Sequence, residues 1–359
     1  MNLNPNIEQA RKNHIAWWNR KGLVLNLKAP KRDAHPKDVL GIPKDCKGRW
    51  TDIRVRCEGA EYGMAKTAYF ADALPLLQTT FGPGSLAEML GAKPVYEPDT
   101  VWYESCIADP DTCGPIRFDP KNNASLDLHV RFADEAMRRS GGRYMVAMSD
   151  LIENLDTLAS LRGSEQLLLD LIERPQWVHQ RQEEILQAFF EVFELFYQKT
   201  KDELGGSAFI FDLWGPGRTC KVQCDFSCMI SASMFREFVS PYLSRQCDWL
   251  DYSMHHLDGE TALQHLDALL AIEPLDAIEW TPIGAAGQST VSHTGGHPQW
   301  YDLYRRIKAG GKSVQAVGVK PEEVVPLLDA VGPEGMYIAT WAPDEDAAQK
   351  LVEQVQQFR

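Results

Sequence analysis

The sequence lacks several features that would place it in a common class of protein. No apolar run in its 359 residues approaches the roughly 20 residues that a membrane-spanning helix needs. The start of the chain does not show the basic segment and apolar stretch of a secretory signal. No Gly-x-Gly-x-x-Gly motif follows an expected strand, which removes the commonest dinucleotide-binding interpretation. We therefore expect a cytoplasmic globular protein, with no low-complexity linker that would divide it into independent domains.

The sequence also has fewer basic than acidic residues, and its cysteines are not closely paired. The chain has 37 Lys and Arg against 50 Asp and Glu, a formal net charge of -13, so nucleic acid and anionic membranes are poor partners because the averaged field repels polyanions. Eight cysteines without a Cys-x-x-Cys pair predict reduced thiols rather than a disulfide framework. Cys220, Cys224 and Cys228 recur every four residues, but their neighbours have little helical character. Free thiols are therefore favoured over a metal cluster there.

What the sequence does have is a regular alternation of strand and helix patterns. Apolar, β-rich runs that are separated by helical patterns of ordinary length occupy residues 74–81, 144–150, 207–212, 252–258, 276–280, 313–319 and 336–341. Repeated strand–helix units predict a parallel sheet, and at this length a (β/α)8 TIM barrel is favoured over an open sheet. The predicted fold class is thus α/β, with residues 1–50 as an N-terminal helix and extension packed on the barrel and 51–359 as the single catalytic barrel domain.

The ends of the expected strands carry the candidate site. In parallel α/β proteins sites are built at these ends, and His256 and Asp258, two residues apart on one strand, project to the same side. Glu279, Asp212 and Asp150 end other expected strands and complete the predicted catalytic set. The predicted substrate-binding residues are an apolar wall and one amide at strand ends: Trp214, Trp280, Trp341 and Gln78.

His256, Asp258 and Glu279 are the predicted ligands of a divalent metal, zinc among others, through one nitrogen and two oxygens. The same groups can also act without metal, as one base and two acids. Simpler interpretations stay open for each: Asp258 precedes Gly259 and suits a turn, and Glu279 can pair with Lys312 or Arg306. The tryptophans can be ordinary packing.

Neighbouring residues point to structure rather than chemistry. His255 is expected to face away from the site because side chains alternate along a strand. Asp225 lies in a stretch that we predict to be a loop, with no obvious partner. Residues 215–218, Gly-Pro-Gly-Arg, are favoured as a turn over an anion-binding loop.

Several segments resemble the uroporphyrinogen decarboxylase-like superfamily, which includes the decarboxylase, corrinoid-linked methyltransferases and epoxyalkane–thiol transferases. The resemblance covers most of the chain, and its clearest part is His256-Leu257-Asp258-Gly259, which looks like the superfamily's His-x-Cys-Gly. The other segments are 81–87, 99–102, 155–163 and 225–242. The resemblance implies a (β/α)8 barrel, in agreement with the strand count.

The resemblance also implies a chemistry. In the zinc methyltransferases of the group, the histidine and cysteine of that motif and a further cysteine near the last strand bind zinc, which activates a thiol for attack on a methyl–cobalt bond. Here His256 matches, Asp258 replaces the first cysteine, and the last strand ends in Thr340-Trp341-Ala342. Carboxylates make a harder site that prefers oxygen ligands. The decarboxylase's arginine-rich N-terminal signature has no counterpart before Phe81.

The sequence thus predicts an enzyme for methyl or alkyl group transfer, with a corrinoid protein as a possible partner and a homodimer as a possible assembly. The first alternative is a metal-assisted lyase or isomerase acting on a small hydroxylated substrate. The second is a barrel that binds a ligand without converting it.

Overall fold

In the computed structural model, which describes residues 6–282 and 294–359, most strands belong to one parallel sheet. This seven-stranded sheet has the order β2-β1-β13-β12-β11-β10-β9, and only the β1–β2 pair is antiparallel. Its strands are β1 (Leu23–Pro30), β2 (Thr67–Ala71), β9 (Thr219–Gln223), β10 (Tyr252–Asp258), β11 (Ala277–Thr281), β12 (Ser313–Val319) and β13 (Met336–Trp341). The chain is therefore an α/β protein with a parallel sheet, as predicted.

A second, four-stranded sheet has the order β3-β6-β7-β8. Its members are β3 (Leu76–Gln78), β6 (Met145–Ala147), β7 (Gly206–Phe209) and β8 (Leu213–Pro216), and β8 returns antiparallel to β7. Strands β4 (Lys93–Tyr96) and β5 (Val101–Glu104) form a separate hairpin. The turn predicted at residues 215–218 is partly wrong, because Gly215 and Pro216 pair with β7 and the tight turn falls earlier, at Phe211 and Asp212.

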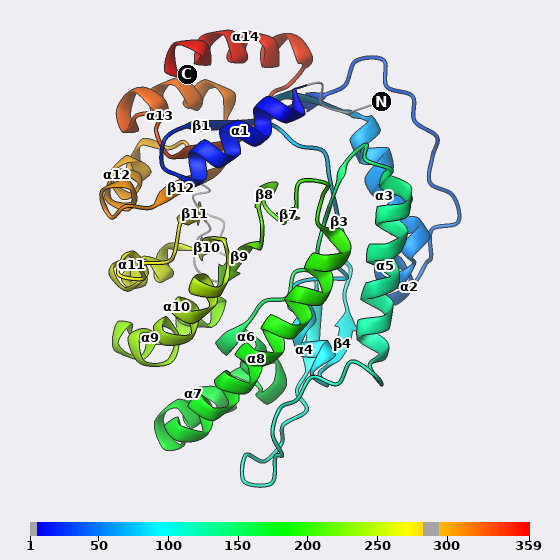
Figure 1. Cartoon of the computed structure of the whole chain (residues 1–359), viewed down its shortest axis with the longest axis vertical. Coiled ribbons are helices and arrows are strands. Elements are labelled where there is room, and N and C mark those ends of the chain that lie inside the picture. The colour runs from blue at the N-terminus through cyan, green and yellow to red at the C-terminus, as the bar shows by residue number, and fades with distance from the viewer. Residues whose placement is uncertain (1–5, 283–293) are drawn as a thin grey trace.

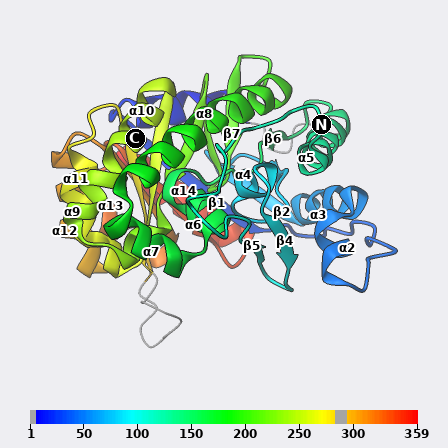
Figure 2. The ribbon, with the colours of Figure 1, turned by 90° about the horizontal axis from the view of Figure 1, so that it is seen from below.

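Helices lie outside the strands. Figure 1 shows α9 to α14 in a row along one side of the molecule, with β9 to β12 on their inner side, and Figure 2 shows the same arrangement from below. The helices are α1 (Ile7–Trp18), α2 (Cys46–Thr51), α3 (Ile53–Ala65), α4 (Ser85–Met89), α5 (Ala124–Ser140), α6 (Asn154–Arg162), α7 (Ser164–Glu173), α8 (Pro175–Thr200), α9 (Ala232–Phe238), α10 (Ser240–Trp249), α11 (Leu266–Leu270), α12 (Tyr301–Ala309), α13 (Pro321–Val331) and α14 (Glu345–Val355), with short 3-10 helices η1 (Asp225–Met229), η2 (Glu260–His265), η4 (Pro298–Trp300) and η5 (Gln356–Phe358).

Local chemistry explains where these helices begin. The side chains of Asn123 and Asp344 accept hydrogen bonds from the amides of Leu126 and Ala347, which satisfies free N–H groups in the first turns of α5 and α14. Proline at the first position opens α8 and α13, where its missing N–H costs nothing. The apolar side of α8 is buried, as its periodicity predicted.

The N-terminal segment is part of the main sheet. Strand β1 pairs in parallel with β13 and antiparallel with β2, and the indole of Trp17 on α1 donates to the carbonyl of Val314 at 3.1 Å. The predicted boundary at residue 50 therefore does not separate an extension from the sheet. No helix among the described residues is long and apolar enough to cross a membrane, and all eight cysteines are unpaired.

Candidate functional site

A row of polar side chains crosses one face of the main sheet. Residues paired across parallel strands share a face, and the pairing joins Gln223 to His256, His256 to Glu279, Glu279 to Gln315, and Gln315 to Tyr337. Most of this row is buried. Polar groups are buried at a cost unless they bond to one another or to a ligand, so the row is a candidate for function rather than for stability.

The turn between β7 and β8 packs against this row. Gln315 donates from Nε2 to the carbonyl of Phe211 at 2.9 Å, and the Tyr337 hydroxyl donates to the carbonyl of Asp212 at 2.9 Å. Both turn residues have positive φ, 64° and 54°, a conformation that costs free energy for residues other than glycine. These contacts hold the turn in place, and the Phe211 ring lies 4.7 Å from the His256 ring.

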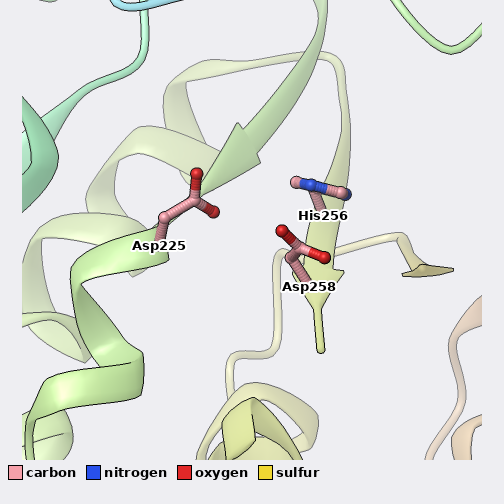
Figure 3. Close-up of side chains that lie close together, drawn as sticks. All are labelled: Asp225, His256 and Asp258. Atoms are coloured by element: carbon pink, nitrogen blue, oxygen red, sulfur yellow. The ribbon is translucent and has the colours of Figure 1, made fainter. Parts of the chain in front are cut away.

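Three side chains converge at the end of the row. Together they offer one nitrogen and two oxygens, atoms of the kind that bind metal ions in proteins. We call these three residues the donor set. One ligand atom each from Asp225, His256 and Asp258 lies within 4.8 Å of the others. Figure 3 shows Asp225 at the start of η1 facing His256 and Asp258 on β10. His256 and Asp258 come together because strand side chains alternate, whereas Asp225 comes from the turn after the adjacent strand, β9.

Glu279 orients the imidazole of His256. His256 Nδ1–H donates to Glu279 Oε2, and Glu279 Oε1 accepts from the Thr281 hydroxyl at 2.6 Å. Burial alone would lower the pKa of His256, but the hydrogen bond and charge of Glu279 outweigh it and raise that pKa above its ordinary value. Because Nδ1 is committed to Glu279, Nε2 is the nitrogen left for a metal ion, as in the carboxylate–histidine pairs behind many metal sites.

Asp225 is held from two sides. Gln223 Nε2 donates to Asp225 Oδ2 at 2.8 Å. The Asp156 carboxylate accepts the amides of Asp225 and Phe226 at 2.8 and 2.7 Å, which fixes the first residues of η1. Burial and then the charge of Asp225 raise the pKa of Asp156. This support engages Oδ2 and the backbone amide of Asp225, while a ligand atom of its carboxylate lies within 4.8 Å of those of His256 and Asp258.

A buried ion pair lies behind Gln223. Lys221 on β9 is fully buried and its Nζ lies 2.8 Å from Asp150 Oδ1; the same amine donates to the Gln223 side chain. Glu153 accepts the amide of Gln223 at 2.9 Å, and burial raises the pKa of Glu153 to about 8. Burial lowers the pKa of Lys221, but the neighbouring carboxylates, first Asp150, outweigh it and raise that pKa overall.

Asp258 is half-buried at the end of β10, and burial raises its pKa. Its Oδ1 has no hydrogen-bond partner within the described part of the chain. A turn residue that caps backbone amides would use that oxygen, so the simpler interpretation of Asp258 as a turn residue is not supported.

The donor set found in the structure differs from the predicted ligand set by one residue. Glu279 is near His256, as the prediction requires, but it bonds to the ring instead of joining the donor set, and it does not pair with Lys312 or Arg306. Asp225, which the sequence assigned to a partnerless loop, takes its place. The missed signal is the strand at residues 219–223, whose apolar and polar residues alternate and which ends two residues before Asp225.

The other predicted acids lie elsewhere. Asp150 pairs with buried Lys221. Asp212 accepts from Asn26 Nδ2 at 2.8 Å and from Lys28 Nζ at 2.6 Å. Neither carboxylate belongs to the group of possible ligands found among the described residues. Asp212 remains near the site through its neighbour Phe211.

The three tryptophans do not form one apolar wall. Trp214 is buried on antiparallel β8, where it donates to Asp202 at 2.9 Å, because the reversed strand carries it away from the site. Trp280 is fully buried on the opposite face of β11 from Glu279 and packs edge-on against Trp300. Trp341 alone is exposed, at 51%, and Gln78 is exposed at the end of β3.

A groove of about 520 Å3 adjoins the donor set. Asp225 and Asp156 form one part of its wall, and Phe226, Trp102 and Met229 form apolar parts of it. Trp102 and Met229 are 66% and 45% exposed. The groove gives a small organic molecule access to the side of Asp225.

The donor set fits a divalent cation. It combines an oriented imidazole with two carboxylates, one of which has a buried oxygen that lacks a partner in the described residues. Carboxylates clustered without a cation repel each other, and a bound ion removes that cost. Oxygen-rich sets of this kind suit manganese, magnesium or zinc better than thiolate-preferring ions.

Comparisons with known proteins show the fold. A methyltransferase from Methanosarcina mazei has a similar structure over 97% of this chain and 98% of its own, with a TM-score of 0.62 and 8% sequence identity. An HpcH/HpaI aldolase from Desulfitobacterium hafniense DCB-2 matches 39% of this chain and 63% of its own at 16% identity, but its TM-score of 0.23 is too low to indicate a shared fold. No family model and no curated protein match the sequence.

Proposed function

We propose that the protein is a metal-dependent enzyme that transfers a methyl or alkyl group, with the ion held by Asp225, His256 and Asp258. The observation that carries the proposal is the convergence of these three ligand atoms within 4.8 Å, with Glu279 behind the imidazole. Zinc is one candidate ion, and the oxygen-rich set also suits manganese.

Similarity of fold supports group transfer as the reaction. The structure that matches nearly the whole chain is that of a methyltransferase, and the His256-Leu257-Asp258-Gly259 segment resembles the motif of the uroporphyrinogen decarboxylase-like superfamily. We extend the proposal to that superfamily and to its (β/α)8 barrel. A parallel bridge between Gly206 and Gly217 and the bond from Thr219 N to Ser207 Oγ at 2.8 Å join β7 to the β9 edge of the main sheet. This is one of the two junctions that a closed barrel needs. Unpaired thiols support a reducing compartment such as the cytoplasm.

The proposed reaction uses a methyl group on the cobalt of a corrinoid partner protein. An ion held by Asp225, His256 and Asp258 would lower the pKa of an acceptor hydroxyl. The acceptor would give up its proton to a carboxylate and attack the methyl carbon through its oxygen. A carbon–oxygen bond would form as the carbon–cobalt bond breaks, with both electrons of that bond left on cobalt. In this scheme Glu279 and Gln223 keep His256 and Asp225 in position.

The donor set also favours a second candidate, a metal-assisted lyase or isomerase of a small hydroxylated compound. Two carboxylates replace the thiolates that would keep a substrate thiol nucleophilic, so the ion would bind substrate oxygens. The groups that do not hold the ion can then move protons.

The metal is tested with EDTA-treated protein titrated with Co2+ or Zn2+. We expect about one equivalent to bind and the affinity to fall at least tenfold in His256→Ala, because one of three ligands is lost. His255→Gln is the matched control: His255 neighbours the ligand on the opposite face of β10 and should leave metal affinity unchanged. Failure of the unaltered protein to bind either ion would overturn the metal site.

The reaction is tested with methylcobalamin and acceptors that carry hydroxyl, carboxylate or thiol groups. We expect loss of the methyl–cobalt absorption and a methylated acceptor, both dependent on His256. Absence of transfer to every acceptor, together with metal-dependent conversion of a hydroxylated compound, would replace group transfer with the second candidate. Ligand-dependent stabilisation with no product would favour a binding protein.

A further inference from the structure

A buried cation lies next to the candidate metal site, on the same face of the main sheet. Lys221 and Gln223 on β9 project to one side because strand side chains alternate, and Gln223 is the residue that pairs with His256. Lys221 is buried. The reaction proposed above does not use this residue.

The ion pair of Lys221 joins two parts of the fold. Its Nζ lies 2.8 Å from Asp150 Oδ1, and Asp150 closely follows β6 of the second sheet. The Asp150 side chain is only 9% exposed. Charged pairs in a protein interior are often no more stabilising than apolar side chains of the same size, so stability alone does not account for this pair.

Lys221 also determines which way the side chain of Gln223 points. A primary amide can turn over so that its oxygen and nitrogen exchange places, whereas an ammonium group can only donate hydrogen bonds. The Lys221 amine donates to Gln223 Oε1. The nitrogen Nε2 therefore lies on the other side of the amide, where it donates to Asp225 Oδ2 at 2.8 Å.

A chain of contacts thus runs from Asp150 through Lys221 and Gln223 to Asp225 of the donor set. Turning the Gln223 amide over would place its oxygen against Asp225 Oδ2, and two acceptors at that distance repel each other. The Asp225 carboxylate would then leave the position in which its ligand atom lies within 4.8 Å of those of the other two members.

The segment that carries Asp150 also holds the backbone of this chain of contacts. Glu153 Oε1 accepts the amide of Gln223 at 2.9 Å. Ile152 and Asn154 in the same segment have positive φ, 45° and 54°, a conformation that costs free energy in residues other than glycine. Such strain persists where the surrounding contacts fix it, which suits a segment that positions a site.

We propose that Lys221 is a positioning residue for the donor set, which acts by fixing the side-chain amide of Gln223 so that it donates to Asp225. Lys221 contacts neither the ion nor the substrate in this scheme. The orientation of Gln223 follows from the hydrogen bonds themselves, whereas its effect on a bound ion rests on the metal site proposed above.

The test replaces both members of the ion pair, as Lys221→Met with Asp150→Asn, because loss of Lys221 alone would leave a buried carboxylate unpaired. We expect the affinity for Co2+ to fall about tenfold, as for other groups that orient a metal ligand. The visible absorption spectrum of bound Co2+ should also change, because it reports the arrangement of the ligands. An unchanged affinity and spectrum would overturn the proposal and leave the metal site standing.

A third substitution, Gln223→Met, decides whether Lys221 acts through the amide. Gln223→Met alone should weaken Co2+ binding about tenfold, and combining it with the pair variant should cause no further loss, because both changes remove the same interaction. Independent effects would instead multiply to about a hundredfold loss, and that result would overturn the proposal.

Lys199→Met with Asp134→Asn is the matched control. It removes an ion pair of the same residue types and of similar length, 2.9 Å, that includes no member of the donor set. The Co2+ affinity and spectrum of this variant should equal those of the unaltered chain, whereas a change equal to that of the pair variant would overturn a specific role for Lys221.

Metal-free protein separates this proposal from the metal site. In NMR spectra of protein made with isotope-labelled glutamine, the signal absent from Gln223→Met identifies the Gln223 side chain. Its Nε2 protons should exchange with water about tenfold more slowly in the unaltered chain than in the pair variant, because Lys221 keeps them bonded to Asp225. Equal exchange rates would overturn the proposal even where Co2+ binds. Slow exchange without Co2+ binding would support the fixed amide and overturn the metal site.

Discussion

At the scale of single residues, chemistry in this protein depends on which partner each group finds. His255 and His256 are neighbours in sequence, yet burial lowers the pKa of His255 to about 3 while Glu279 raises that of His256. Strand alternation puts one ring among helices and the other beside a carboxylate. Residue type therefore identifies candidates, and the local partner decides their role.

A third histidine makes the stability of the protein depend on pH. His14 on α1 is fully buried, and burial lowers its pKa below the ordinary value of 6.5, only partly offset by the charge of Asp72. The unfolded chain takes up a proton near pH 6.5, whereas the folded protein does so only at lower pH. The free energy of unfolding should therefore decrease as pH falls below 6.5, by up to about 1.4 kcal/mol per pH unit from this group, until its folded pKa is reached.

Urea unfolding at pH 7.5, 6.5 and 5.5 checks this expectation. His14→Gln keeps a donor for the carbonyl of Asp72, which His14 contacts at 3.2 Å, and should show a smaller loss of stability toward low pH. His35→Gln, a change at an exposed histidine, should behave like the unaltered chain. Identical pH dependence in all three proteins would contradict the assignment to His14.

At the scale of elements, the short helix η1 places a member of the donor set that no strand carries. Its first residue is Asp225, and the Asp156 carboxylate of α6 accepts the first two amides of η1. Backbone amides at a helix start need such acceptors. The position of Asp225 is thus set by a residue 69 places earlier in the chain.

Asp156→Asn tests that support. The amide side chain can accept at only one oxygen, so one backbone amide loses its partner and the free energy of unfolding should fall by about 1–3 kcal/mol. We also expect Co2+ affinity to fall about tenfold because Asp225 is no longer fixed. Asp109→Asn is the control, since Asp109 is an exposed aspartate that likewise accepts a backbone amide, at 3.0 Å. Unchanged Co2+ affinity in Asp156→Asn would contradict a positioning role.

At the scale of the whole molecule, the two ends of the chain form one sheet. Strand β1, near the N-terminus, pairs with β13, near the C-terminus. Helix α1 packs against β1, and its Trp17 and Trp18 donate to carbonyls of β12 and β8. A cavity of about 360 Å3 takes its lining residues from β1, β12 and β13 together. Its lining therefore exists only when residues near both ends of the chain are in place.

A fragment of residues 51–359 should consequently not fold on its own. It loses α1 and β1, which exposes the edge of β13 and removes the buried indoles of Trp17 and Trp18. Circular dichroism during heating should show no cooperative transition, in contrast to the full chain prepared in the same way. A fragment with a sharp transition and full Co2+ affinity would show that the first 50 residues are dispensable.

The sequence by itself determined several of the regular elements and the pair on β10. The expected strands at residues 252–258, 313–319 and 336–341 match β10, β12 and β13, since apolar periodicity and helix-start residues act locally. His256 and Asp258 share a face for the same local reason.

Only the tertiary structure decided which acids join them. Asp225 lies at the site because β9 pairs with β10. Glu279 bonds to the ring of His256, and Trp214 lies away from the site because β8 runs antiparallel to β7. These outcomes depend on contacts between residues far apart in sequence. A shift of one residue in strand register moves every side chain of that strand to the other face of the sheet, so it changes which side chains meet. Local sequence patterns contain no information about such contacts, so the members of the donor set are brought together only when the chain is folded.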